Sequence, residues 1–464
     1  MCDKTKPVAA QHQSLFNEFE PVSSKQWKQQ IQYDLKGADY NETLVWESPE
    51  GIKVKPFYHR DEFEHKTHIS HPDSFAIGQD IFVFDIEKSA YRALDSVNRG
   101  AESIRFTVDN PEVDVSKLLA DLPLENITVF FDLQFLSPNF VGKIDAIAAA
   151  RNAKIFCLID PIGQLAADGN WFPTKDNFID LQQIAAAKHV GTIAVKAGLY
   201  QNAGANIVQQ IAYTLGHANE YFNRMGNIAQ PMVLQMAIGS NYFFEIAKLR
   251  ATRLLFKRIG QEYGHTQDCH ILATPTRRNK TIYDYNVNML RTTTECMSAA
   301  LGGADTVINL PYDAVYHKSN EFGERISRNQ LLILKHESYF DKVSNAADGS
   351  YYIESLTEQL AEKALALFKD IEAAGGFLKQ LTEGNVQRKI SESAEKEQAL
   401  FDAGKEVLLG TNKYPNKNDR MADDLELFPF VKKKPRKTLI TPIIPRRLAE
   451  KMEQERLETE KQSS

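Results

Sequence analysis

The feature that most constrains the fold of this chain is a regular alternation of short apolar β-rich segments with amphipathic helical segments, which begins near residue 75. The β-rich segments are almost continuously apolar, as expected of strands buried on both faces of a parallel sheet. Successive segments lie roughly 25 to 40 residues apart, which leaves room for one helix between each pair. The expected strands are 103–108, 127–133, 154–160, 191–197, 231–238, 270–274, 305–311 and, more weakly, 339–345.

Eight strand–helix units in succession predict an α/β protein of the closed (β/α)8, or TIM-barrel, class. An open, doubly wound sheet is the alternative arrangement of the same elements. That alternative is less favoured, because a dinucleotide-binding fold requires a GxGxxG turn after its first strand and no such turn follows the first expected strand here. We therefore expect a barrel with an extended N-terminal arm and C-terminal helices.

The barrel is expected to be the central of three regions. Residues 1–74 are interpreted as an N-terminal arm and linker, because they hold few apolar residues and cannot bury much on themselves. Within this arm, Ser23 and Ser24 precede a short helical pattern as N-terminal caps. The barrel and its following helices are expected over residues 75–416, and a basic linker with a charged C-terminal helix over residues 417–464.

Two further segments help to place the C-terminal elements. A long amphipathic helical pattern starts at Ser355 and stops at Gly375 and Gly376, as glycine commonly ends a helix. The basic segment KKKPRK, residues 432–437, is interpreted as a solvated linker rather than a binding site.

Composition argues against several classes of function. The net charge of −6 and the pI of about 6.1 give no indication of binding to nucleic acid or to an anionic membrane. No apolar run reaches the length of about 18 residues that a membrane span needs, and the N-terminal segment is too polar for a signal peptide. We therefore expect a cytoplasmic protein without membrane association.

The four cysteines do not indicate a zinc site or a disulfide framework. They are Cys2, Cys157, Cys269 and Cys296, and no two of them form a CxxC pair. Reduced and mostly buried thiols are the expected state.

In a (β/α)8 barrel, the active site lies at the C-terminal ends of the strands, so the polar residues there are the first candidates. Three of them, Asp109, Asp132 and Asp160, could together hold a hard metal ion. Asp109 and Asp160 also stand in turn sequences, where aspartate bonds the following backbone, so no metal site is expected. The remaining strand-end residues are Gln134, Lys196, Gln201, Gln235, Asn241, Thr274, Arg277, Asn309 and Tyr312.

No recognisable catalytic set emerges from these residues. Lys196 could form a Schiff base if desolvated, but pairing with a nearby acid is the favoured interpretation. His270 is expected to be a satisfied histidine, and the cluster of His59, His65, His68 and His71 is expected at a surface or interface. No GxSxG, P-loop or HExxH motif occurs. The pocket candidates are Lys196, Gln201, Asn241 and Asn309.

Several long phrases, taken together in order, go beyond this generic barrel. They include MAIGSNYFFEIAKLRATRLL, NVNMLRTTTECMSAALGGADTV, ERISRNQLLILKHES, ADGSYYIESLTEQLAEKALALF and EVLLGTNKYPN, which start at residues 236, 286, 324, 347 and 406. They strongly resemble the methylmalonyl-CoA mutase family of adenosylcobalamin-dependent acyl-CoA mutases. The segments EGIKVKPFYHRDEF and FAIGQDIFVFDIEKSAYRALDSVNRGAESIRF resemble the small (β) subunit of such enzymes.

The resemblance implies a reaction and a cofactor. The family interconverts methylmalonyl-CoA and succinyl-CoA by a radical rearrangement, in which the cofactor supplies the hard chemistry and the protein orients and shields the radicals. In the family, the acyl-CoA lies along the barrel axis, and a separate C-terminal domain holds cobalamin through a histidine in a DxHxxG motif.

This sequence departs from the family pattern at the positions that carry the chemistry. No DxHxxG motif occurs. The resemblance places Leu272 at the family's catalytic histidine, Asp305 at a substrate-binding glutamine and Ile308 at a second histidine. DPIGQLAADGNWF, residues 160–172, replaces the segment that contacts the substrate's carboxylate. A carboxylate at Asp305 would repel the carboxylate of the substrate in a low-dielectric interior.

These departures predict a non-catalytic small subunit, inactive when isolated and binding no cofactor by itself. A large (α) subunit would carry adenosylcobalamin and the acyl-CoA substrate, and the N-terminal arm would wrap that partner. Two alternatives stay open: a competent mutase barrel that works with a separate cobalamin-binding protein, and an unrelated barrel enzyme built on Asp132, Asp160 or Lys196.

Overall fold

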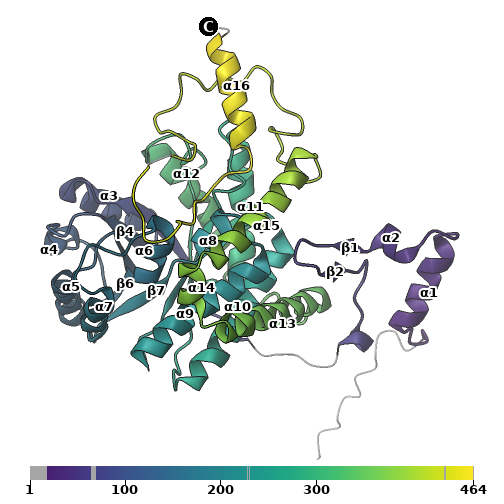
Figure 1. The fold of residues 1–464 in the computed structure, drawn as a ribbon, viewed down its shortest axis with the longest axis horizontal. Helices are drawn as coiled ribbons and strands as arrows, with labels where there is room; N and C mark the ends of the chain where they lie inside the picture. Colours follow the sequence, from purple (N-terminus) through teal and green to yellow (C-terminus); the bar gives the residue numbers. More distant parts are fainter. Residues whose placement is uncertain (1–17, 64–68, 227, 229, 433–434, 463–464) are drawn as a thin grey trace, which may run out of the picture. The chain divides into compact units, whose positions relative to one another are not determined.

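The computed structural model describes residues 18–63, 69–226, 228, 230–432 and 435–462 of the chain (Figure 1). It divides into two compact units, Met1–Lys66 and Thr67–Ser464, which are described separately below.

The first unit is a small assembly of short elements. It contains α1 (Ser24–Asp34), α2 (Tyr40–Leu44), a 3-10 turn (Arg60–Glu62), and an antiparallel pair formed by β1 (Trp46–Glu47) and β2 (Lys53–Val54). Ser23 caps α1 by accepting a hydrogen bond from the backbone N–H of Gln26, which confirms the expected cap. In the part of the chain that the structure describes, none of the side chains of helix α1 is buried.

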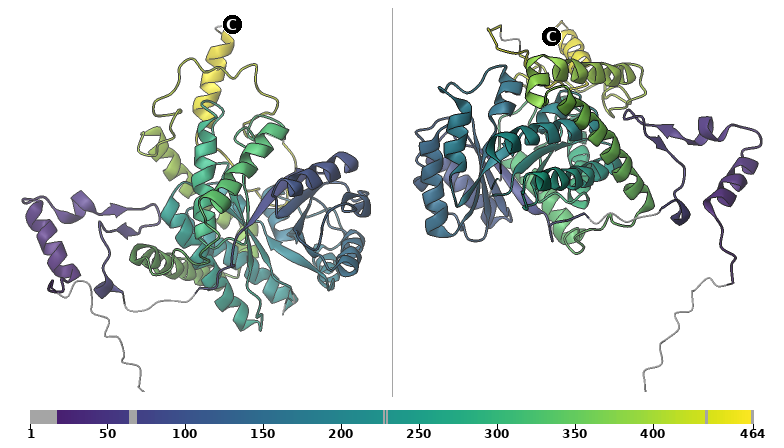
Figure 2. Two further views of the ribbon diagram at one scale, coloured as in Figure 1. Left: turned by 180° about the vertical axis from the view of Figure 1, so that it is seen from behind. Right: turned by 60° about the horizontal axis from the view of Figure 1, so that its bottom comes forward.

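The second unit is built around a closed barrel of eight parallel strands, which confirms the predicted (β/α)8 class (Figures 1 and 2). Each strand pairs with its neighbours in chain order, and the last strand closes on the first. The strands are β3 (Ala76–Phe82), β4 (Ser103–Val108), β5 (Thr128–Leu133), β6 (Lys154–Ile159), β7 (Val190–Val195), β8 (Val233–Ile238), β9 (His270–Pro275) and β10 (Thr306–Ile308).

One expected strand is wrong and one strand was missed. Residues 339–345 form turns after a π-helical turn (Ile333–Glu337), whereas the eighth strand is β3, which precedes all the expected ones. In β3, Gly78, Gln79 and Asp80 interrupt the apolar run and weaken its strand signal. Gly78 is required there, because a Cβ atom would lie 2.4 Å from Cγ1 of Ile308 on the neighbouring strand.

Helices surround the barrel, and three long ones pack against each other on one side. Helix α13 (Tyr351–Ala373) lies along α9 (Ile207–Met225) and α10 (Tyr242–Glu262). It ends before Gly375 and Gly376, both with positive φ, as the sequence predicts. The other helices of this unit are α3 (Ile86–Asn98), α4 (Val115–Leu118), α5 (Pro138–Arg151), α6 (Pro161–Asp168), α7 (Asn177–Ala185), α8 (Gly198–Asn202), α11 (Val287–Leu301), α12 (Glu321–Leu332), α14 (Phe377–Thr382), α15 (Asn385–Asp402) and α16 (Glu450–Gln462).

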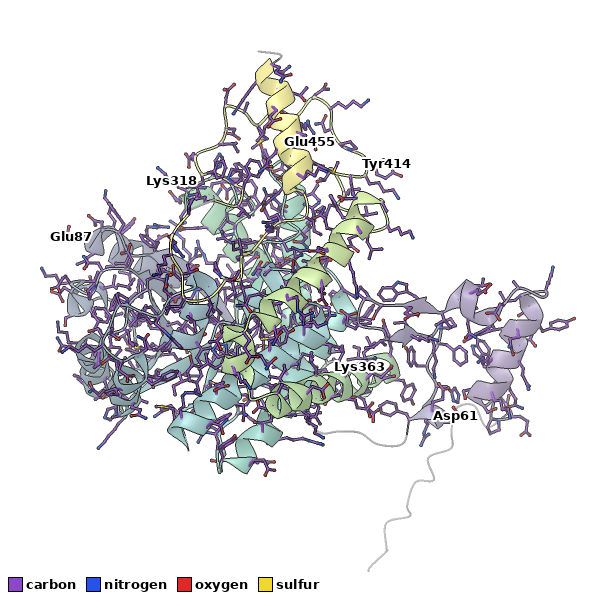
Figure 3. All side chains as sticks on the ribbon, viewed as in Figure 1. Asp61, Glu87, Lys318, Lys363, Tyr414 and Glu455 are labelled. Carbon is purple, nitrogen blue, oxygen red and sulfur yellow. The ribbon has the colours of Figure 1, made fainter. Side chains whose placement is uncertain are left out.

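Charged side chains are exposed on the outside of this unit, among them Glu87 on α3, Lys363 on α13 and Lys318 in the loop before α12 (Figure 3). Within the described residues, no helix combines the length and apolarity needed to cross a bilayer.

A C-terminal strap, residues 439–448, passes over the segments that follow three barrel strands. Its backbone N–H groups donate to Gly169 and Ala166 after β6, to Asn202 after β7, and to Arg278 after β9. The strap then leads into α16, the charged C-terminal helix that the sequence predicts. In the preceding basic segment, Lys433 and Lys434 lie outside the described residues, while Arg436 pairs with Asp168 at 2.6 Å.

Candidate functional site: the barrel interior and its mouth

Bulky apolar side chains fill the centre of the barrel. The side chains come from six different strands and form one contact cluster, which is possible only across the barrel interior. All of them are at most 4% exposed. The members of this central plug are Phe130, Phe156, Leu158, Ala194, Val233, Leu272 and Ile308.

Two glycines make room for the plug. A Cβ atom on Gly78 would overlap Ile308, and one on Gly191 would lie 2.3 Å from the ring of Phe156. Each glycine therefore gives its interior volume to a larger neighbour on the adjacent strand.

Aromatic stacking closes the end of the plug nearer the N-terminal ends of the strands. The rings of Phe130 and Phe156 stack at 5.4 Å with an interplanar angle of 13°, and the His270 ring lies 5.3 and 5.1 Å from them. Nε2 of His270 hydrogen-bonds Oγ1 of Thr306 at 3.0 Å, so the expectation of a satisfied histidine is confirmed. Burial lowers the pKa of His270 to about 4, so the ring is neutral near pH 7.

Leu272, which the resemblance aligns with a catalytic histidine, is fully buried within this plug. Ile308, at the position of the second histidine, is 2% exposed and belongs to the same cluster. Both positions therefore carry packing contacts instead of polar groups that could meet a ligand.

Asp305 lies at the other end of the barrel from the mouth, directly before β10. Its Oδ2 accepts hydrogen bonds from Nη2 of Arg253 and from the backbone N–H of Ile271, both at 2.7 Å. The buried Arg253 guanidinium offsets the carboxylate's charge, so Asp305 is a structural ion pair and not an isolated buried charge.

Above the plug, the C-terminal mouth of the barrel carries two ion pairs. Arg105 donates to both carboxylate oxygens of Asp80, at 3.0 and 2.7 Å, in a bidentate contact. Lys196 donates to Oδ1 of Asp132 at 2.6 Å, so the favoured pairing of this lysine with an acid is observed. These four charged groups at the mouth are thus engaged in pairs.

The four pocket candidates do not converge on one cavity. Lys196 follows Ala194 of the plug on the same face of its strand. Gln201 is buried and accepts a hydrogen bond from Thr276 at 2.6 Å. Asn309 donates to Ser327 and Gln330 of α12, both at 2.9 Å, and therefore faces away from the barrel axis. Asn241 is partly buried at the start of α10 and makes no capping bond.

The three aspartates once considered for a metal site are in different surroundings. Asp109 is exposed, Asp132 pairs with Lys196, and Asp160 is 1% exposed. Oδ1 of Asp160 accepts the backbone N–H of Gly163 at 2.7 Å, which is the turn bond that the DPIG sequence predicts.

Asp160 is also the centre of a buried polar network behind β6 and β7. Its Oδ1 lies 2.8 Å from Nε2 of His217 and accepts a 2.5 Å hydrogen bond from Tyr221, while Oδ2 accepts the backbone N–H of Lys196. Tyr200 hydrogen-bonds Nδ1 of His217 at 2.8 Å. Burial raises the pKa of Asp160, but His217 and the hydrogen bonds outweigh it, so the pKa is lowered overall.

The remaining histidines and cysteines only partly follow the sequence expectations. His71, expected at a surface or interface, has a side chain that is only 4% exposed and lies 3.4 Å from Asp348, whereas His59 is half-exposed beside Asp61. His65, His68 and Cys2 lie outside the described residues. The other cysteines, Cys157, Cys269 and Cys296, are free and buried, as expected.

Sequence reasoning missed the mouth pair of Asp80 and Arg105 and the aromatic plug of Phe130 and Phe156. Asp80 lies on β3, the strand that was not counted. The signal that could have revealed the plug is the inward register of phenylalanines in two neighbouring strands, FF in β5 and IF in β6.

The fold and this interior define a class: a (β/α)8 barrel whose centre is filled by packed apolar side chains. The family model described as methylmalonyl-CoA mutase matches residues 113–457. The chain therefore belongs to the methylmalonyl-CoA mutase family, which depends on adenosylcobalamin.

Curated relatives agree with this assignment. The methylmalonyl-CoA mutase small subunit of Porphyromonas gingivalis is 34% identical, over 90% of this chain and 74% of its own length. The small subunit of Streptomyces virginiae is 27% identical, over 72% of this chain and 55% of that protein. The methylmalonyl-CoA mutase of Rhizobium meliloti is 28% identical, over 87% of this chain and 65% of that enzyme.

Solved structures add only a distant likeness. The Yersinia pestis DHPS structure covers 57% of this chain at 12% identity and a TM-score of 0.32, and 94% of that chain is covered. A likeness at this level carries no argument about function.

Replacement of Asp160 by asparagine tests the buried network. We expect Asp160→Asn to lower the free energy of unfolding by about 3 to 5 kcal/mol at pH 7, because it breaks a buried charged network. Because the pKa of Asp160 is lower in the folded chain than the unfolded value of 3.8, its carboxylate stabilises the fold above pH 3.8. The difference in the free energy of unfolding between Asp160→Asn and the unmodified chain should therefore shrink as the pH falls below 3.8. Chemical unfolding at several pH values measures both effects.

The matched control is Asp121→Asn, at an exposed aspartate, which should change stability by no more than about 0.5 kcal/mol. Equal effects of the two substitutions, or a loss for Asp160→Asn that does not depend on pH, would contradict the role given to Asp160.

Proposed function

We propose that this chain is the small, non-catalytic subunit of a heterodimeric methylmalonyl-CoA mutase. Its large subunit would carry adenosylcobalamin and perform the isomerisation of methylmalonyl-CoA and succinyl-CoA. The chain spans between about half and three quarters of the length of the curated relatives described above, so this activity belongs to the proposed complex.

One observation carries the proposal: Leu272 occupies the family's histidine position and is packed into the central plug. If the family's acyl-CoA lies along the barrel axis, it must pass through the volume that Phe130, Phe156 and Ile308 fill. Opening that volume would remove the packing of several large side chains. For a buried phenylalanine, the loss of packing costs about 3 to 5 kcal/mol of folding free energy. A barrel of this kind is suited to support a partner and unsuited to hold the substrate.

The resemblance places the histidine that holds cobalamin in a separate domain and not in the barrel, and this sequence has no DxHxxG motif. At the barrel mouth, the carboxylates of Asp80 and Asp132 are paired with Arg105 and Lys196. We therefore assign no step of the reaction to this chain.

The N-terminal unit supports a role in assembly. Within the described residues, helix α1 has no buried side chain, and Trp27 and Tyr33 on it are 51% and 80% exposed. Exposed aromatic residues of this kind are the common anchors of protein–protein interfaces. The proposed partner for this surface is the large subunit, whose existence the names of the small-subunit relatives imply.

Co-purification tests the assignment of activity. We expect that the tagged chain, co-expressed with the large-subunit candidate of its own organism, yields a complex that isomerises methylmalonyl-CoA when adenosylcobalamin is added. The tagged chain alone should show no turnover, because its barrel axis is closed. The matched variant Leu272→His should also be inactive alone, because the rest of the plug stays in place.

Two outcomes would overturn this account. Turnover by the lone chain with adenosylcobalamin, or with a separate small cobalamin protein, would favour the competent-barrel alternative. Turnover by the large-subunit candidate that is unaffected by this chain, with no complex formed, would remove the subunit assignment.

The arm gives a second prediction for the same complex. Removal of residues 1–60 should weaken association with the large subunit by about tenfold or more, and Trp27→Ala together with Tyr33→Ala should reproduce most of this loss. Tyr91→Ala is the control, because Tyr91 is 72% exposed but lies on α3 of the barrel unit. Analytical ultracentrifugation measures the dissociation constants, and unchanged values for the truncated chain would rule out a contact through the arm.

A further inference from the structure

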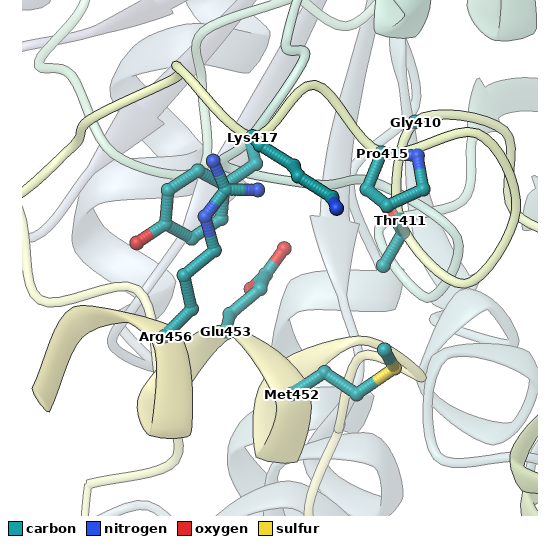
Figure 4. A pocket seen from close by; sticks show the side chains of 8 residues that line it. Gly410, Thr411, Pro415, Lys417, Met452, Glu453 and Arg456 are labelled. Carbon is teal, nitrogen blue, oxygen red and sulfur yellow. The ribbon is translucent and has the colours of Figure 1, made fainter. Parts of the chain in front are cut away.

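A cavity of about 320 Å³ lies beside α16, apart from the barrel axis (Figure 4). Three segments line it: Tyr283 in the loop after β9, residues 410–417, most of which belong to the EVLLGTNKYPN phrase, and the first turns of α16. The proposed function of the chain makes no use of this cavity.

The wall formed by residues 408–413 is rigid. The side chain of Asn412 accepts from the backbone N–H of Leu408 at 2.8 Å and donates to the carbonyl of Glu406 at 2.7 Å, which fixes the turn. At its tip, Gly410 has φ +77°, and a Cβ atom there would lie 2.3 Å from a carboxylate oxygen of Asp284. Only glycine fits this close approach.

The opposite wall is also held in place. The Arg456 guanidinium lies 3.9 Å from the centre of the Tyr283 ring and donates to the carbonyls of Asn416 and Asp419 at 2.7 and 2.6 Å. The Tyr283 hydroxyl donates to Glu460 at 2.7 Å. The cavity is therefore formed before any ligand arrives, which lowers the entropic cost of binding.

Two buried polar atoms at this cavity lack a hydrogen bond within the described part of the chain. They are Oγ1 of Thr411 and Oε2 of Glu453. The other oxygen of Glu453 accepts the backbone N–H of Ile282 at 2.9 Å, and Oε2 faces Arg447 at 2.6 Å in an ion pair without hydrogen-bond geometry. Buried polar atoms are rarely left without a hydrogen bond, so the Thr411 hydroxyl indicates a missing partner molecule, and Oε2 of Glu453, which has Arg447 on one side, can accept a second hydrogen bond from it.

The charges at the cavity favour an anion. Arg447 offsets the carboxylate of Glu453, and Arg456 lies 3.8 Å from the carboxylate of Glu460, which leaves Lys417 as the cation of the lining without an acidic partner. Lys417 makes no hydrogen bond or ion pair with the described residues, and its ammonium group points into the cavity above Glu453 (Figure 4). An accessible lysine beside a cavity of this kind provides a site for a carboxylate.

We propose that this cavity binds a small carboxylic acid that bears a hydroxyl or ammonium group and an apolar tail. The ligand's carboxylate pairs with Lys417 and accepts from the Thr411 hydroxyl. Its hydroxyl or ammonium group donates to Oε2 of Glu453. The tail lies against the Met452 side chain and the Tyr283 ring, which supply the apolar part of the lining.

Titration of the full chain with three matched probes tests the proposal by ligand-observed NMR. The probes are L-phenylalanine, L-3-phenyllactate and 3-phenylpropanoate, which share a tail and a carboxylate. The first two carry an ammonium or hydroxyl group next to the carboxylate, and the third carries neither. We expect one of the first two to bind about tenfold more tightly than 3-phenylpropanoate, and their comparison shows which donor the site prefers.

Lys417→Gln should weaken binding of the preferred probe about tenfold, and Thr411→Val should weaken it severalfold. Lys413→Gln is the control, because Lys413 lies on the same loop but its ammonium group sits 5.7 Å from the centre of the Tyr414 ring. Unchanged thermal unfolding of all three variants shows that the walls are intact.

Three results would overturn the proposal: no probe binds below about 10 mM, Lys417→Gln and Lys413→Gln bind alike, or 3-phenylpropanoate binds as well as the other two. Each would mean that ordered water alone satisfies Thr411 and Glu453. The test is independent of mutase activity, because it uses only this chain.

Discussion

The packing of Phe130 and Phe156 against Leu272 and Ile308 is the constraint on which the rest of the account depends. These side chains come from strands that do not all adjoin, and they meet on the barrel axis. A (β/α)8 barrel normally fills its interior with layers of side chains, and its chemistry then lies above them at the mouth. A barrel that takes a substrate along its axis must give up this packing. Here the packing is kept, and Gly78 and Gly191 make room for it.

The charged residues at the mouth above the plug are consistent with a barrel whose role is structural. Asp80 with Arg105 is an ion pair between the neighbouring strands β3 and β4, whereas Asp132 at the end of β5 pairs with Lys196 after β7, across β6. Both pairs join strand ends where the sheet would otherwise expose polar side chains. Behind the mouth, Asp160 connects the ends of β6 and β7 to α9 through His217. The strand-end positions that could have held a reacting group thus contribute to the stability of the barrel. This arrangement supports the proposal that the activity of the complex belongs to the partner and that this chain contributes surfaces.

Much of the fold could be predicted from the sequence, because seven strands are short, apolar and separated by helical patterns. The eighth, β3, could not, because Gly78 and Asp80 serve the plug and the mouth and so break the apolar pattern. Residues 339–345 were expected as a strand because a barrel needs eight strands and the sequence there has aromatic and apolar residues. In the structure these residues lie in turns.

The site was predictable only in part. The resemblance directed attention to Leu272, and the structure adds what that residue contacts. Periodicity alone does not reveal which residues of a doubly buried strand point inward, so the inward direction of Phe130 and Phe156 required the register of the closed sheet. Asp305 illustrates the same limit, because its partner Arg253 lies 52 residues away on α10 and no local pattern connects the two.

The most direct test of the central claim is the number of acyl-CoA molecules that the two-subunit complex binds. Calorimetric titration of the purified complex with succinyl-CoA gives this number without reference to turnover. The account predicts one molecule for each pair of subunits, because only the partner's barrel would have an open axis. A value of two would mean that this barrel also admits the ligand and that the plug opens, which would contradict the account.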